Sequence, residues 1–107
     1  MKDQTAITPQ DILRLQDNAK ALAAKDVTIK KKAFLSYAIG SITNTTERRF
    51  SYLTVKLNLF DGNGKFVGST SDAVQNCEPN QVWNFEAGIL EGEATSVVVS
   101  DIKGWLV

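Results

Sequence analysis

Few side chains in this sequence combine the types and spacing that catalysis needs. Glu91 and Glu93 are carboxylates separated by one glycine, and the run 69–72 places hydroxyl side chains beside Asp72. Paired acids work as general acid and base when one of them is desolvated, because burial raises the pKa of a carboxyl group. These acids lie in segments typical of solvated turns, so we predict no catalytic residue and no enzyme. An enzyme that uses carboxylates alone is the alternative.

The chain has no histidine and one cysteine, Cys77. These absences exclude a Ser-His-Asp or Cys-His nucleophile and a conventional zinc site. A single cysteine also excludes a disulfide within the chain. Asn76 and Glu78 flank Cys77 and supply no cation that would lower the pKa of the thiol. We therefore predict a thiol without a function, and neither a metal nor a cofactor.

The segment Asp61-Gly62-Asn63-Gly64-Lys65 begins like a calcium loop, with oxygen ligands at alternate positions. Lys65 brings a positive charge to the fifth position, and Phe66 stands where such a loop needs glycine. Asp, Asn and Gly are also the residues that tight hairpins require. We predict a hairpin turn here and no bound calcium.

Basic residues gather at 30–32, which is Lys-Lys-Lys, and at Arg48-Arg49, close to Phe50 and Tyr52. A basic aromatic patch can hold phosphates and stack bases. However, twelve Lys and Arg balance twelve Asp and Glu, so the chain lacks the overall attraction that a polyanion partner needs. We expect no nucleic-acid partner. The lysines are expected to protect an edge strand, with weak attraction to a membrane surface as the alternative role.

The length of 107 residues predicts one domain. Within it, apolar residues recur with two different spacings, and these spacings predict the secondary structure that positions the residues above. Apolar residues at steps of three and four predict an amphipathic α-helix over 8–26, with Thr8 as its cap and Pro9 at its first position. Residues 1–7 are expected to be a disordered tail. The apolar face of the helix carries Ile12, Leu15, Ala19, Leu22 and Ala23.

From residue 27 the apolar residues alternate with polar ones, which is typical of β-strands. In 50–60, Leu53, Val55, Leu57 and Leu59 share one face, and Tyr52, Thr54, Lys56 and Asn58 share the other. Further strands are expected at 34–43, 65–70, 82–89 and 97–102, with 27–32 as an edge strand. Trp83 and Phe85 are expected in the core, and Asn44 is expected to close a turn through its side chain. The fold class is mainly β, an antiparallel immunoglobulin-like sandwich of about 6–7 strands preceded by one helix.

Residues 33–105 resemble the FxLYD domain family, a bacterial immunoglobulin-like sandwich of envelope and surface proteins. Gly40 to Asn44 is similar to its G-x-V-x-N strand, and Leu57-Asn58-Leu59-Phe60-Asp61 resembles its name-giving motif. Gly62 to Lys65 is like the turn that follows, and Pro79 with Trp83-Asn84-Phe85 is like its P-G-x-x-x-x-F segment. Leu57, Phe60 and Asn80 depart from the Phe, Tyr and Gly of the family. The resemblance implies an FxLYD-like sandwich over 27–107, an extracytoplasmic location and no catalytic residues.

We therefore expect a non-enzymatic binding or spacer module that recognises a protein partner through an exposed sheet face or edge. The candidate partner-binding residues are Tyr37, Arg49, Tyr52, Lys56 and Trp105. Trp105 is expected either to close the end of the sandwich or to contact a neighbour. The alternative function is a self-associating structural unit, in which Ile12, Leu15 and Leu22 pack on a second copy. The expected state is a monomer or a weak homo-oligomer.

Overall fold

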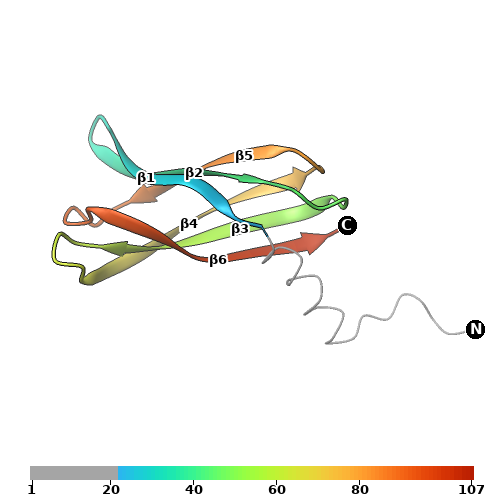
Figure 1. The fold of residues 1–107 in the computed structure, drawn as a ribbon. Helices are drawn as coiled ribbons and strands as arrows, with labels where there is room; N and C mark the ends of the chain where they lie inside the picture. Colours follow the sequence, from blue (N-terminus) through green and yellow to red (C-terminus); the bar gives the residue numbers. More distant parts are fainter. Residues whose placement is uncertain (1–21) are drawn as a thin grey trace, which may run out of the picture.

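The computed structural model describes residues 22–107, which form two antiparallel sheets (Figure 1). Each sheet has three strands, in the orders β1-β2-β5 and β4-β3-β6. The strands are β1 (Ala24–Lys32), β2 (Leu35–Thr43), β3 (Phe50–Phe60), β4 (Phe66–Cys77), β5 (Val82–Ile89) and β6 (Ser96–Leu106). The prediction of a mainly β protein with antiparallel sheets is confirmed for this part of the chain.

Inward-facing side chains of both sheets form one hydrophobic core. Leu53, Val55, Leu57 and Leu59 of β3 are completely buried, and Trp83, Phe85 and Ala87 of β5 are buried on the facing sheet. The rings of Trp83 and Phe85 meet edge to face, with their centroids 5.9 Å apart. The alternation in the sequence therefore predicted the buried face of both strands correctly, because successive strand residues point to opposite sides.

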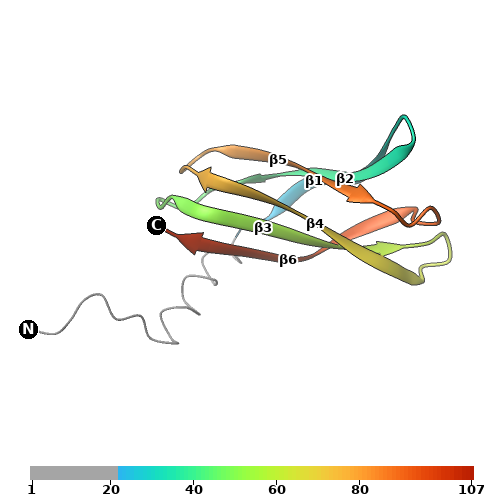
Figure 2. The ribbon, with the colours of Figure 1, turned by 180° about the vertical axis from the view of Figure 1, so that it is seen from behind.

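Side chains of β4 connect the two sheets along one side of the molecule, where β4 and β5 lie side by side (Figure 2). The Thr70 hydroxyl donates a hydrogen bond of 2.6 Å to the Gly88 carbonyl oxygen. The Glu86 backbone N–H donates to the Asp72 carboxylate at 2.9 Å. Both backbone groups belong to β5, which is an edge strand. The side chains of β4 therefore form hydrogen bonds with groups that could otherwise pair with a strand of another molecule.

Asn44 connects two loops at one end of the sandwich. Its fully buried side-chain amide donates to the carbonyl oxygens of Arg48, at 2.8 Å, and Cys77, at 3.2 Å. Its amide oxygen accepts hydrogen bonds from the backbone N–H and the hydroxyl of Thr46. Its backbone also pairs with Gln81 and Asn80 of the β4–β5 loop. Asn44 closes its turn as predicted and also joins β2 to the loop after β4.

Several predicted boundaries were wrong. β4 extends to Cys77 instead of ending at residue 70, and β6 extends to Leu106 instead of ending at residue 102. The apolar positions of the alternation are interrupted by the polar Asp72 in β4 and by Gly104 in β6, while the backbone pairing with β3 continues. The edge strand predicted at 27–32 is present as β1, and it starts earlier, at Ala24.

The predicted helix 8–26 is wrong over residues 24–26, which are the start of β1. The rest of this helix, except for residues 22 and 23, lies outside the described residues, as does the tail 1–7. Leu22, which the prediction placed on the apolar face of the helix, is 5% exposed and belongs to the core of the sandwich. It is therefore not available to pack on a second copy of the chain in the way the alternative function requires.

Candidate functional site

The outer face of the β4-β3-β6 sheet carries three of the five predicted partner-binding residues. On β3, Tyr52 and Lys56 point away from the core because their neighbours Leu53, Val55 and Leu57 point into it. Trp105 lies on β6 directly opposite Tyr52, and Asp101 lies opposite Lys56. We call this surface the β3–β6 face; its residues are Tyr52, Thr54, Lys56, Asp101, Lys103 and Trp105.

The side chains of Tyr52 and Trp105 contact each other on this face. Their ring centroids are 5.6 Å apart and their planes are tilted by 50°. Tyr52 is 40% exposed and Trp105 is 38% exposed, so each ring keeps a free surface despite the contact. Such a pair presents a large apolar area with polar N–H and O–H groups at its margin.

A β-bulge holds the aromatic pair in place. The register between β3 and β6 shifts between Phe50 and Tyr52, which leaves Ser51 as an extra residue of β3 opposite β6. The Ser51 hydroxyl donates a hydrogen bond of 2.9 Å to the carbonyl oxygen of Trp105. The bulge allows Phe50 to be buried while Tyr52 two residues later faces outward.

A shallow hollow of about 370 Å³ adjoins the aromatic pair on the same sheet. The Lys103 ammonium lies 3.8 Å from the Asp101 carboxylate within it. The residues that line it are mainly hydroxyl and charged side chains: Thr54, Val55, Lys56, Ser69, Thr70, Ser71, Asp101 and Lys103. The charged groups and the hydroxyls of Thr54, Ser69 and Ser71 can form hydrogen bonds and ion pairs with a ligand or partner, whereas the Thr70 hydroxyl is already donated to Gly88. Thr54 and Lys103 face each other across β3 and β6, and they are the members of the face nearest to the aromatic pair.

The structure does not bring the other two candidate residues to this face. Tyr37 is on β2 in the opposite sheet, where the Lys32 ammonium lies 5.3 Å from the centroid of its ring. Arg49 precedes β3, and its guanidinium contacts the Asn76 amide oxygen at 3.3 Å and the Glu78 carboxylate at 3.8 Å. The predicted set is therefore divided between three places on the surface.

Sequence reasoning missed Asp101 and Lys103. Lys103 was missed because the last strand was predicted to end at residue 102, and Asp101, although inside that strand, was not connected with Trp105. Since β6 continues to Leu106, Asp101, Lys103 and Trp105 alternate on one side of a single strand. The spacing of two residues between them was the available signal. Trp105 neither closes the end of the sandwich nor folds back, because it is an ordinary outward residue of β6.

The remaining chemical candidates have structural roles. The Asp61 carboxylate accepts hydrogen bonds from the backbone N–H groups of Asn63 and Lys65, each at 2.9 Å, as expected for a hairpin turn. The Glu91 carboxyl group lies against Gly68, where even a Cβ atom would meet it at 2.5 Å. Within residues 22–107, no cluster of three or more Cys, Asp or Glu side chains could hold a metal ion.

The Cys77 side chain is completely buried beside Phe50 on the paired strand. Burial raises the pKa of the Cys77 thiol, and the negative charge of Glu78 raises it further. The thiolate, which is the reactive form, is therefore disfavoured.

Comparison with known proteins gives no match: no family model matches the chain, and neither the curated proteins nor the solved structures contain a significant relative. The resemblance to FxLYD domains thus stays a prediction. In the part of the chain that the structure describes, no helix is long and apolar enough to cross a membrane. A function for this protein must accordingly rest on the surface described above.

Proposed function

We propose that this protein is a non-enzymatic binding module that recognises another protein through the β3–β6 face. The observation that carries the proposal is the pair Tyr52–Trp105, in which two aromatic rings in contact remain partly exposed on a β-sheet. Tyr and Trp are the residues most enriched among those that dominate binding energy at protein interfaces. They bury a large area and lose little conformational freedom on binding.

The groups around the pair support recognition of a protein surface. Lys56, Asp101 and Lys103 carry charges of both signs at the side of the aromatic pair. An apolar centre with a polar, charged margin is the usual arrangement of a protein–protein interface. The margin would select the partner through complementary charges, while the aromatic pair would supply most of the affinity.

The strand order supports an immunoglobulin-like sandwich as the framework. In that fold the first, second and fifth strands share one sheet, and the third and sixth share the other. β1, β2, β5, β3 and β6 have this distribution, and β4 departs from the constant-type arrangement by pairing with β3. The resemblance to FxLYD domains is the support for placing the module in a bacterial envelope or surface protein.

Affinity capture with paired variants tests the proposal. The immobilised protein is expected to recover one partner in stoichiometric amount from an envelope extract. The double variant Tyr52→Ala/Trp105→Ala should weaken binding of that partner by about 30-fold or more, the loss typical of residues that dominate an interface. Phe66→Ala is the matched control, since Phe66 is an exposed aromatic residue outside the β3–β6 face.

The readout must separate binding from folding. Thermal unfolding of each variant shows whether the sandwich is intact, because Tyr52 and Trp105 lie outside the core. A folded double variant that binds the recovered partner as tightly as the unmodified protein would overturn the proposal. Equal losses for Phe66→Ala and for the double variant would also overturn it, because the β3–β6 face would then have no special role.

A further inference from the structure

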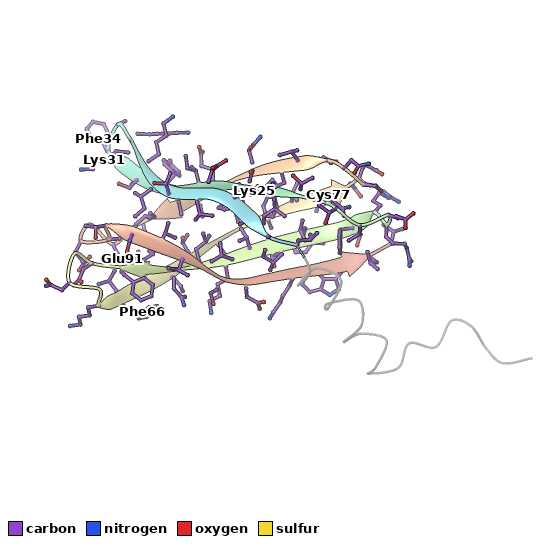
Figure 3. All side chains as sticks on the ribbon, viewed as in Figure 1. Lys25, Lys31, Phe34, Phe66, Cys77 and Glu91 are labelled. Carbon is purple, nitrogen blue, oxygen red and sulfur yellow. The ribbon has the colours of Figure 1, made fainter. Side chains whose placement is uncertain are left out.

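The tip of the β1–β2 hairpin exposes an aromatic side chain among lysines. We define the hairpin tip as residues 30–35, with Lys30, Lys31 and Lys32 on β1, Ala33 and Phe34 in the turn, and Leu35 on β2. Phe34 is 101% exposed, so its ring touches almost nothing else in the protein. Figure 3 shows Phe34 and Lys31 at the extremity of the hairpin, which points away from the other loops at this end (Figure 1).

Lysines surround Phe34 on both faces of the hairpin. Lys30 pairs with Tyr37 and Lys32 with Leu35 in the register, while Lys31 pairs with Ser36 on the opposite face. Lys30 and Lys31 are exposed. Lys32 forms an ion pair with Glu86 and is partly neutralised. The nearby carboxylates Glu91 and Glu93 belong to the β5–β6 loop, so the tip itself carries only positive charge.

A second apolar residue lies beside the tip. Leu90 is 87% exposed and directly follows Ile89, which pairs with Ser36 of β2. The register therefore places Leu90 next to the start of β2, where Leu35 is also exposed. Phe34, Leu35 and Leu90 are thus three exposed apolar side chains at this end of the β1-β2-β5 sheet, and none of them belongs to the core.

Protection of an edge strand explains only part of this arrangement. Lysines on β1 discourage another strand from pairing with it, which is their expected role. A fully exposed Phe at the turn gives no such protection, and it leaves a large apolar surface in water. Apolar residues flanked by lysines are instead the combination that lies in a membrane interface, with rings among the acyl chains and ammonium groups at the headgroups.

We propose that the hairpin tip docks on an anionic lipid bilayer, with Phe34 inserted into the interface and Lys30 and Lys31 at the lipid phosphates. The charge of the tip complements the negative surface of such a bilayer. A nucleic acid fits less well, because Phe34 projects from a turn and does not line a groove along which bases could stack. Docking through this tip is separate from the proposed protein recognition, because it leaves Tyr52 and Trp105 on another surface free.

Vesicle binding tests the proposal with the full chain. Binding to vesicles of phosphatidylcholine mixed with phosphatidylglycerol is expected, whereas vesicles of phosphatidylcholine alone should bind much less and added salt should weaken binding. Lys31→Ala should lower the affinity about fivefold, the contribution of one lysine near an anionic surface. Lys25→Ala is the matched control, since Lys25 is exposed on the same strand at the far end from the tip (Figure 3).

A second pair of variants tests whether Phe34 inserts into the bilayer. Phe34→Ala should lower the affinity about tenfold through the loss of buried apolar area. Phe66→Ala, on the neighbouring β3–β4 hairpin, should leave it unchanged. In a Phe34→Trp variant, lipids brominated on their acyl chains should quench tryptophan fluorescence beyond the quenching seen with the unmodified protein. The native Trp83 and Trp105 lie on β5 and β6, outside the tip.

Three results would overturn the proposal. The first is equal binding to neutral and anionic vesicles, or no binding to either. The second is an equal loss for Lys25→Ala and Lys31→Ala, which would show a general charge effect. The third is binding of a single-stranded oligonucleotide with the same dependence on Phe34 and Lys31, which would assign the tip to nucleic acid instead. None of these results depends on the β3–β6 face.

Discussion

The loops at the two ends of the sandwich differ in how tightly they are held by the rest of the fold. At the end with the β2–β3 and β4–β5 loops, a buried asparagine, Asn44, joins the loops through its side chain and backbone. At the other end, the β1–β2 hairpin leaves Phe34 without contacts. One end therefore contributes to stability, and the other exposes surface that the fold itself does not need.

Backbone strain is lower at the Asn44 end than at the hairpin tip. At the Asn44 end, the left-handed conformations belong to Asn76 and Asn80, with φ values of 57° and 65°. Asparagine tolerates this region well. At the hairpin tip, Ala33 has φ of 46°, in a region that costs a residue with a Cβ atom about 1 kcal/mol. The comparison indicates that the first end is adapted for stability and that the tip retains strain.

The largest expected effect comes from removing the connection at Asn44. Asn44→Ala should lower the free energy of unfolding by about 3 kcal/mol, because the buried Cys77 carbonyl oxygen loses its side-chain donor and the Arg48 carbonyl oxygen keeps only the Thr46 hydroxyl as a donor. Urea denaturation measures this change. Asn63→Ala is the control, since Asn63 is an exposed residue in the turn of the β3–β4 hairpin, and it should change stability by only a few tenths of a kcal/mol. Similar values for both variants would contradict the contrast between the ends.

An intermediate effect is expected from the buried thiol at the Asn44 end. The pKa of Cys77 is raised in the folded protein. Below the ordinary pKa of a thiol both states keep the proton; above it the unfolded chain loses the proton first, so the free energy of unfolding should fall as the pH rises. Cys77→Ala should remove this part of the alkaline slope. Urea titrations of both proteins across the alkaline range measure it, and identical slopes would contradict the burial of the thiol.

The smallest expected effect is a gain of stability at the hairpin tip. Ala33→Gly should raise the free energy of unfolding by up to about 1 kcal/mol, because glycine adopts a positive φ without steric cost. The control is Ala73→Gly, since Ala73 is exposed on β4 with ordinary strand geometry, and it should lose about 0.5–1 kcal/mol. Thermal unfolding measures both. A loss of stability in Ala33→Gly would show that the turn is not strained.

Local sequence patterns predicted the central part of the fold well. β3 and β5 have the predicted limits, and Leu53 and Phe85 are buried as the alternation requires. The hairpin at Asp61 and the turn at Asn44 were predicted from residue types that form such turns through their own side chains. In each case the cause lies within a few residues of the effect.

The errors occurred where a distant strand decides the outcome. Residues 24–26 form the first part of β1 because β2 supplies a partner for Ala24 and Lys25, even though their spacing suits a helix. Residues 103–106 continue β6 because they pair with β3. The second error also affected the prediction of the candidate site. Lys103 and Trp105 lie on one face because β6 continues past residue 102, and the shorter predicted strand did not show this.

The sequence by itself determined that the chain changes from helical to alternating spacing, which side of each central strand is buried, and where the tight turns lie. These properties are local, because residue type and period fix them within a few positions. The tertiary structure decided that Tyr52 meets Trp105 and that Thr70 and Asp72 hydrogen-bond to the edge of β5. These contacts join residues far apart in the chain, and pairing between strands, which no local pattern encodes, brings them together.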